Sequence, residues 1–167
     1  MENVETKKIA AQTVIAMQHE GGYNDIGGVY RKLHAWARAQ KISPNGKGFT
    51  VFLNPPTEFD AQSGLFEVCL PVPAGVKAQG EAAVKTVPAC TVACVSVQGP
   101  YDQIAAHYTE MLAWLDAEGL EVAGPPREVY VKGPDATGKG NPKEYVTEIQ
   151  FPVRRPISSS ILFSASY

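Results

Sequence analysis

The chain has 167 residues, 44% of them apolar and 9% aromatic, which is the composition of a compact folded protein and not of a disordered segment. This length leaves no room for a separate DNA-reading region of about a hundred residues beside a sensing domain, so we do not expect the chain alone to be a one-component transcription regulator. The formal net charge of −2 argues against nucleic acid as a partner, because phosphate binding needs a concentrated basic surface.

The first half of the chain predicts one helix among several strands. A strand is expected at the apolar run Val14–Met17. A helix should follow, because apolar residues recur on one stripe at helical spacing, namely Ile26, Val29, Tyr30, Leu33 and Ala37. Asn24 stands where an N-cap side chain would accept a hydrogen bond from the first helical turn. Two further strands are expected at residues 49–53 and 65–72.

The second half predicts the same succession of elements. The apolar run Val92–Val97 indicates a strand, and Asp102 stands at the expected N-cap. The helical stripe that follows consists of Ile104, Tyr108, Met111 and Leu115. Strands at residues 128–132 and 145–153 complete this half.

The likeness of the two halves is an internal repeat. Residues 22–40 align with residues 100–118 without a gap at an offset of 78, and six of the nineteen positions are identical. Later, the segment EVCLPV starting at Glu67 aligns with EIQFPV starting at Glu148, at an offset of 81. We therefore expect a single domain, residues 1–167, built of two repeats at about 7–77 and 85–155. The tail, residues 156–167, is left unassigned.

The repeat predicts the fold class. A three-stranded sheet with one helix would be poorly buried by itself, so two copies should pair about a pseudo-twofold axis. We predict an α+β fold with two strand-helix-strand-strand repeats, an antiparallel sheet and a ligand groove on the axis between the repeats. Grooves between lobes are the usual location of small-molecule sites.

The cysteines do not indicate a metal site or disulfides. Cys69, Cys90 and Cys94 are odd in number, and the Cys90–Cys94 spacing lacks a second Cys or His pair to complete a zinc site. We expect reduced thiols, no metal and no cofactor.

The sequence also carries no sign of a membrane span or a secretion signal. No run approaches the roughly eighteen apolar residues that a spanning helix needs, and the first fifteen residues include several charges. We expect a cytoplasmic protein with no membrane partner.

Aromatic residues at equivalent positions of the two repeats are candidates for the walls of the groove. Trp36 and Trp114 stand at the edges of their helical stripes, where each indole could face the groove or close the rim of its own core. Phe52 and Tyr130 are equivalent at the offset of 78 and could line the groove, or fill the core while their valine and leucine neighbours face it. Three tyrosines, Tyr30, Tyr101 and Tyr108, are interpreted as packing residues whose hydroxyl groups could reach the groove, and His107 as a residue at the edge of its stripe.

Alternation along the last strand of each repeat assigns two faces. Every second side chain of these strands should pack beneath the helices, namely Val68, Leu70 and Val72 in the first repeat and Ile149, Phe151 and Val153 in the second. Glu67 and Glu148 then point to the opposite face. A glutamate on the polar face of a strand is ordinarily only hydrated, and whether Glu67 also lines the groove is open.

The chain resembles the GyrI-like, or AraC-effector-binding, family of small-molecule-binding domains. The resemblance covers roughly residues 7–155 and rests on the doubled unit together with three segments, QGPY at Gln98–Tyr101, LAWL at Leu112–Leu115 and YVTEIQFPV at Tyr145–Val153. The family that the chain resembles includes drug-sensing domains, stand-alone binding proteins, a gyrase inhibitor and hydrolases of cyclopropane-bearing alkylating compounds.

The resemblance implies a role for Glu148, which matches the position of the glutamate that meets cationic ligands in this family. A carboxylate in an apolar cleft is costly to ionise unless a cation compensates it, so such a site should select positively charged aromatic guests. Glu148, Trp36, Trp114, Tyr130 and Phe52 are thus the candidate ligand-binding residues.

Three functions follow as hypotheses. The first is binding of hydrophobic, often cationic aromatic molecules, for sensing or sequestration. The second is hydrolytic opening of cyclopropane-bearing alkylating compounds, with Glu148 as the catalytic residue that activates water. The third is inhibition of a protein partner of the gyrase type through an acidic surface, to which Glu110, Asp116 and Glu118 would contribute. The sequence does not separate binding from hydrolysis.

Overall fold

The computed structural model describes residues 3–54, 64–77, 80–135 and 138–156. Eight strands form one antiparallel sheet in the order β1-β6-β9-β8-β3-β4-β2-β5, and β7 pairs with the end of β9. The α+β class and the antiparallel sheet predicted from the sequence are confirmed. The elements are β1 (Glu5–Ile9), β2 (Gln12–Gly21), α1 (Ile26–Ala39), β3 (Phe49–Phe52), β4 (Gly64–Pro71), β5 (Ala83–Val87), β6 (Cys90–Gln98), α2 (Ala106–Ala117), β7 (Glu121–Val122), β8 (Arg127–Lys132) and β9 (Val146–Arg154).

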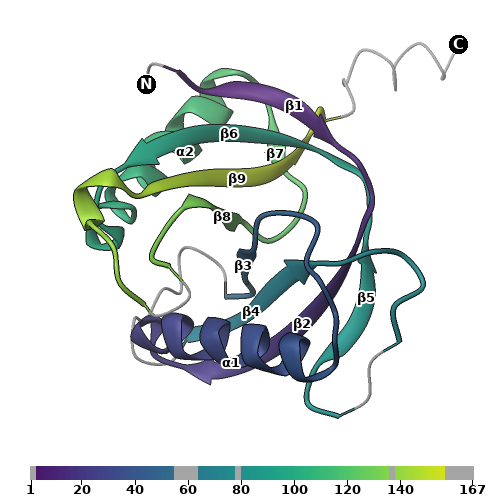
Figure 1. Cartoon of the computed structure of the whole chain (residues 1–167). Coiled ribbons are helices and arrows are strands. Elements are labelled where there is room, and N and C mark those ends of the chain that lie inside the picture. Colours follow the sequence, from purple (N-terminus) through teal and green to yellow (C-terminus); the bar gives the residue numbers. More distant parts are fainter. Residues whose placement is uncertain (1–2, 55–63, 78–79, 136–137, 157–167) are drawn as a thin grey trace, which may run out of the picture.

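Each repeat starts with a long bent strand, of which sequence analysis found only the second half. Glu5 pairs with Cys94 and Gln12 pairs with Val87, so the β1–β6 and β2–β5 ladders share one register. Residues 5–21 and 83–98 are therefore two antiparallel strands that pair across a common bend, and Figure 1 shows β1 continuing along one side of the molecule into β2. β1 and β5 escaped prediction because both are short and mostly exposed, with sequences ETKKI and AVKTV.

The two repeats also meet at the pairing of β3 with β8. Thr50 lies opposite Glu128, and these two residues are equivalent at the offset of 78. On either side of them, Phe49 pairs with Val129 and Val51 pairs with Arg127. Because exchanging the repeats maps this ladder onto itself, the pseudo-twofold axis passes between Thr50 and Glu128.

Both helices cover the same face of the sheet, which we call the helix face. α1 packs with Leu33 and Ala37 on the Val68 and Leu70 side of β4. α2 packs in the same way on β9, through a cluster that contains Met111, Leu115, Ile149, Phe151 and Val153. The predicted stripes and the predicted inward positions of the last strands are thus observed.

The opposite face, which we call the reverse face, has a smaller core of its own. Val14, Ala16, Phe49 and Cys69 are buried there, with Val129 packed against them. These side chains come from three neighbouring strands of the first repeat and from β8 of the second. The sheet is therefore packed on both faces, as the largely apolar sequences of its central strands require.

The predicted N-caps are wrong. Residues 23–25 and 101–103 form short 3-10 turns, and Asn24 and Asp102 lie inside them. The helices begin one to three residues later, after Asp25 and Ala105, and neither of these makes a side-chain cap hydrogen bond. The 3-10 turns supply the reason, because their backbone carbonyls already accept hydrogen bonds from nearby amides, as Gly22 does from Asp25.

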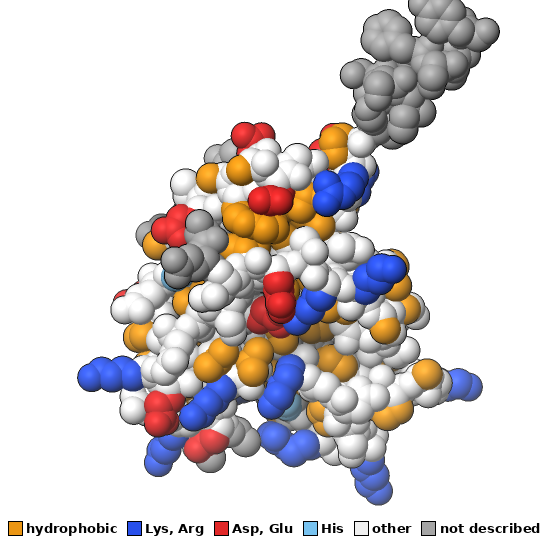
Figure 2. Space-filling model, turned by 90° about the horizontal axis from the view of Figure 1, so that it is seen from above, with side chains coloured by type: hydrophobic (Ala, Val, Ile, Leu, Met, Phe, Trp, Pro, Cys, Tyr) orange, Lys and Arg blue, Asp and Glu red, His pale blue; other side chains and the backbone are white. Residues whose placement is uncertain are grey.

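The surface is mixed in charge. In the view of Figure 2, lysine and arginine side chains lie both at the edges and in the lower middle of the molecule, and hydrophobic side chains show between them. Within the described ranges, neither helix has the length and apolar character that a membrane-spanning helix requires.

Candidate functional site

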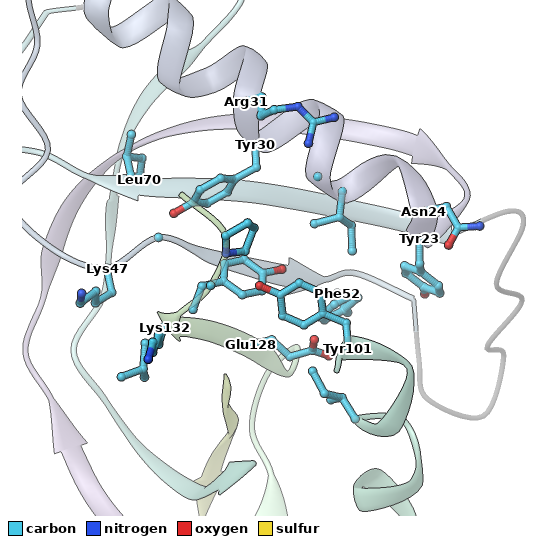
Figure 3. Close-up of a pocket in the computed structure, with 18 of the residues that line it drawn as sticks. Tyr23, Asn24, Tyr30, Arg31, Lys47, Phe52, Leu70, Tyr101, Glu128 and Lys132 are labelled. Atoms are coloured by element: carbon cyan, nitrogen blue, oxygen red, sulfur yellow. The ribbon is translucent and has the colours of Figure 1, made fainter. Parts of the chain in front are cut away.

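A cavity of about 1500 Å³ lies on the helix face between the two helices. Its lining includes residues of α1, of the segment leading into α2, and of the β3–β8 junction (Figure 3). Several lining residues are equivalent across the repeat: Tyr23 and Tyr101, Ile26 and Ile104, Tyr30 and Tyr108, and Phe52 and Tyr130. The cavity thus lies on the pseudo-twofold axis, where the groove was predicted.

Aromatic rings line this cavity in matching pairs. The rings of Tyr23 and Phe52 meet edge to face with centroids 5.4 Å apart, and their equivalents Tyr101 and Tyr130 do the same at 5.9 Å. Tyr30 of the first repeat also contacts Tyr130 of the second, at 5.5 Å. These edge-to-face contacts fix the orientation of the rings that line the cavity.

Tyr30 owes its position to a glycine. Its hydroxyl group lies against the backbone of Gly48, and a Cβ atom placed on Gly48 would come within 2.0 Å of the Tyr30 hydroxyl oxygen. Only glycine permits this approach, so Gly48, in the loop after α1, allows Tyr30 to take its position in the cavity lining.

The symmetry of the floor is broken at the axis itself. Thr50 and Glu128 are paired and share the helix face, but one is a neutral hydroxyl and the other a carboxyl group. Thr50 Oγ1 lies 2.5 Å from the hydroxyl oxygen of Tyr130. Glu128 accepts a hydrogen bond from the hydroxyl group of Tyr108. Figure 3 shows the Glu128 side chain extending from β8 into the same space as Tyr101 and Phe52.

Burial controls the ionisation of these groups. Desolvation raises the pKa of Glu128 from 4.5 to about 7, and the hydrogen bond from Tyr108 opposes this rise. Burial and the nearby carboxyl group raise the pKa of both Tyr108 and Tyr130 well above 10. The cavity floor therefore holds an ionisable carboxyl group near its titration midpoint at neutral pH, flanked by tyrosines that keep their protons.

The structure corrects the assignment of Glu148. On β9 it lies opposite Val129, so its side chain is on the reverse face, away from the helices and outside the lining of the large cavity. Its carboxylate oxygen lies 2.5 Å from Lys7 Nζ. Glu67 makes the corresponding ion pair with Lys85, which is equivalent to Lys7. The two glutamates therefore match each other as reverse-face ion pairs, and Glu67 does not line the cavity.

The structure also separates the aromatic candidates. Phe52 and Tyr130 line the cavity, and their role in ligand binding stays a prediction. Trp36 and Trp114 do not line it, because each indole packs against the core beneath its own helix. Of the two roles considered for the indoles, the structure therefore agrees with packing against the core of each repeat.

Sequence reasoning missed Glu128 and underrated the tyrosines. Residues two apart on a strand share a face, so a Tyr130 that faces the groove already places Glu128 in it. This was the available signal, since Glu128 opens the strand predicted at residues 128–132. Tyr23, Tyr30, Tyr101 and Tyr108 all line the cavity, although the stripe pattern alone could not distinguish lining from packing.

No arrangement for a metal was found. Across the residues described by the structure, no three His, Cys, Asp or Glu side chains are grouped so that they could hold an ion. Conventional motifs for nucleophilic catalysis or phosphate binding do not occur in the sequence either. The cavity lining combines several phenols with the carboxyl group of Glu128 and, at exposed positions, the carboxyl groups of Asp102 and Asp135.

A family model described as the GyrI-like small molecule binding domain matches residues 2–154. The chain belongs to this family. The resemblance drawn from the sequence is thus confirmed, together with a place among small-molecule-binding domains. No protein with a curated description matches the chain.

Solved structures of low sequence identity share the fold. The C-terminal domain of EcmrR has a TM-score of 0.82 at 23% identity, with 92% of this chain and 98% of that domain covered. The chain spans 58% of the longer EcmrR protein in its DNA complex, with 92% of this chain covered, a TM-score of 0.83 and 23% identity.

Two further structures cover similar shares of the chain. A hydrolase from Listeria innocua has a TM-score of 0.65 at 13% identity, with 91% of this chain and 92% of that one covered. SAV2435 bound to tetraphenylphosphonium has a TM-score of 0.61 at 15% identity, with 91% and 94% covered. These likenesses establish the fold of the chain.

The raised pKa of Glu128 predicts a pH-dependent stability. Between pH 4.5 and 7 the folded protein keeps a proton on Glu128 that the unfolded chain has lost, so the free energy of unfolding falls as pH rises, by at most about 1.4 kcal/mol per pH unit. Glu128→Gln removes this dependence. Denaturant unfolding should therefore show that Glu128→Gln gains stability over the wild type between pH 5 and pH 8.

The exposed Glu110 on α2 provides the control, because Glu110→Gln removes the same charge from a hydrated position and should show no such gain. A Glu128→Gln variant whose advantage is equal at pH 5 and pH 8 would mean that Glu128 titrates in the folded state as it does in water.

Proposed function

We propose that this protein binds hydrophobic aromatic cations in the cavity between the repeats, with Glu128 as the countercharge. The observation that supports this most is a carboxyl group of raised pKa on the floor of a cavity lined by tyrosine rings. Membership of a small-molecule-binding family agrees with it. So does the structure of SAV2435, a protein of the same fold bound to tetraphenylphosphonium.

The energetics favour a cationic guest. Ionised Glu128 is costly without a partner in this buried position, and a bound cation offsets that cost. Each tyrosine face adds a cation–π attraction of roughly 0.5 to 2 kcal/mol. The cavity rim also includes basic residues, among them Arg31, Lys47 and Lys132, which are exposed to solvent. Water and salt screen exposed charges far more than buried ones, so Glu128 should dominate the choice of ligand.

Binding should be linked to loss of a proton. A cation prefers the ionised form of Glu128, so ligand binding at neutral pH releases the proton that this residue still carries. Affinity should then rise with pH up to and somewhat beyond 7. The neutral tyrosines provide apolar surface and one hydrogen bond to the carboxylate throughout this range.

The proposal predicts a specific loss in Glu128→Gln. Calorimetric titration with tetraphenylphosphonium at pH 8 should show affinity at least about tenfold weaker than that of the wild type, which corresponds to about 1.4 kcal/mol. The wild-type affinity should fall by about tenfold from pH 8 to pH 6, and the variant should lose this dependence.

Glu148→Gln is the matched control, because it removes a carboxylate from the reverse face and should leave affinity unchanged. Tetraphenylborate has the same shape as tetraphenylphosphonium and the opposite charge, so comparing the two ions tests whether the cavity selects a positive charge. Equal binding of the two ions by the wild type, or a loss confined to Glu148→Gln, would contradict the proposal.

A second candidate function is hydrolytic opening of cyclopropane-bearing alkylating compounds. It is favoured by the pKa of about 7 for Glu128, which suits a general base at neutral pH, and by the hydrogen bond from Tyr108. Glu128 would take a proton from water, the hydroxide would add to one ring carbon, and a proton would return to the other carbon of the broken bond. A hydrolase from Listeria innocua shares the fold.

This second candidate predicts a ring-opened product heavier than the substrate by one water. Incubation of the protein with a cyclopropane alkylator, followed by mass spectrometry, should detect that product, and Glu128→Gln should form it at least about a hundredfold more slowly. Glu148→Gln should retain the wild-type rate. Product formation at equal rates in all three proteins would exclude Glu128 as the base.

The third hypothesis, inhibition of a gyrase-type partner, is not proposed. Glu110, Asp116 and Glu118 are exposed on and just after α2. Charged side chains on a solvent-facing helix are ordinarily only hydrated. Nothing in their arrangement distinguishes a docking surface from such a face.

A further inference from the structure

A second, smaller cavity of about 180 Å³ lies on the reverse face of the sheet, behind the β3–β8 junction. It shares the loop residues Gly46 and Lys47 with the large cavity but is otherwise lined by different side chains. Its remaining lining residues are Ile9, Gln12, Phe49, Pro71, Arg127, Val129 and Gln150. None of these nine lining residues is acidic.

Arg127 is the unusual member of this set. Its side chain is buried, with an exposed fraction of 6% for the residue, although arginine is almost never buried without a paired anion. One guanidinium nitrogen, Nη2, donates to the sulfur of Cys90 at 2.9 Å. The guanidinium carbon lies 5.9 Å from the centroid of the Phe49 ring. Among the described residues, no ion pair includes Arg127.

Two acidic residues of this face lie close to Arg127 in the sheet, and both are already paired with lysines: Glu148 with Lys7 and Glu67 with Lys85. Gln150 lies opposite Arg127 in the ladder, and Glu148 is two residues before it on β9. The carboxylate of Glu148 is engaged with Lys7 Nζ and accepts a hydrogen bond from the Gln150 side chain at 3.4 Å. Arg127 lines this cavity, and its guanidinium group has N–H donors that no carboxylate among the described residues accepts from.

We propose that this second cavity binds a small organic anion, a monocarboxylate with a short carbon chain, through the guanidinium group of Arg127. The planar guanidinium offers parallel N–H donors that match the two oxygens of a carboxylate. A bound carboxylate would neutralise a buried charge that has a thiol and an aromatic ring as neighbours but no carboxylate partner among the described residues.

The other lining residues select the size and character of the anion. The amides of Gln12 and Gln150 can donate further hydrogen bonds, whereas Ile9, Phe49 and Val129 provide apolar walls. The volume equals that of roughly six water molecules at about 30 Å³ each. This space fits a carboxylate with a few carbon atoms, and the apolar walls favour it over phosphate, which would need polar partners on all sides.

The two cavities lie on opposite faces of the sheet, and β8 contributes residues to each of them. Arg127 and Glu128 are successive residues of β8, so their side chains point to opposite faces. The same strand thus presents a cation to one cavity and a carboxyl group to the other. The proposal for Arg127 does not rest on the function proposed for the large cavity.

The test compares thermal unfolding of the full chain in sodium butyrate, sodium phosphate and sodium chloride at equal ionic strength and pH. Butyrate should raise the unfolding temperature of the wild type above its value in chloride, because a ligand that binds only the folded state stabilises it. Arg127→Met should lose this rise. Arg155→Met, which removes an exposed arginine, should keep it.

Two measurements guard against a variant that fails to fold. Arg127→Lys keeps the positive charge and most of the side-chain length, and should weaken butyrate binding about tenfold because the two-pronged contact is lost. In the wild type, butyrate should shift the NMR signal of the Arg127 side-chain Nε–H group. No stabilisation beyond chloride, stabilisation by phosphate alone, or a butyrate effect unchanged in the Arg127 variants would each overturn the proposal.

Discussion

The pairing of Thr50 with Glu128 is the contact on which the site depends. It joins the two repeats through β3 and β8 and lies on the axis that relates them. Because paired residues on neighbouring strands share a face, both side chains are on the helix face; Thr50 is fully buried there, and Glu128 lines the cavity. A duplicated fold thus places an unmatched carboxyl group in the lining of the cavity that lies between its two repeats.

The asymmetry at this position separates architecture from chemistry. Other features recur in both repeats: Tyr23 and Tyr30 of the cavity lining have equivalents in Tyr101 and Tyr108, and the Lys7–Glu148 ion pair on the reverse face has its counterpart in Lys85 and Glu67. At the axis, Thr50 bonds to Tyr130 whereas Glu128 is held by Tyr108. An exact twofold axis would place two carboxyl groups side by side, which would strongly raise the pKa of at least one of them. A single glutamate beside a threonine avoids that repulsion and keeps one group able to ionise.

Much of the fold could be predicted because it rests on local periodicity and on the repeat. The helical stripes that include Leu33 and Met111 reach the core as the pattern indicates. The N-caps failed at Asn24 and Asp102 because the 3-10 turns before the helices satisfy their amides through the backbone. β1 and β5 were missed because both are short and mostly exposed, and their strand pairing with distant segments leaves no apolar pattern in the sequence.

The site was only partly predictable. The expected groove on the axis exists, and Phe52 and Tyr130 line it, because equivalent positions of a duplicated unit converge there. The sequence could not indicate on which face of the sheet the groove opens. Glu148 was chosen from the family resemblance, but it lies on the reverse face, whereas the cavity lies between the helices and is lined by Glu128. The buried Arg127 could not have been identified either, because burial of a charged residue depends on its neighbours in three dimensions.

The most direct test of the account is a crystal structure of the protein with tetraphenylphosphonium bound. The account predicts the phosphonium group between the two helices, with Glu128 as the nearest carboxylate and the rings of Tyr30 and Tyr101 against its phenyl groups. A cation seated instead on the reverse face beside Glu148, with the space above Glu128 left to solvent, would contradict it.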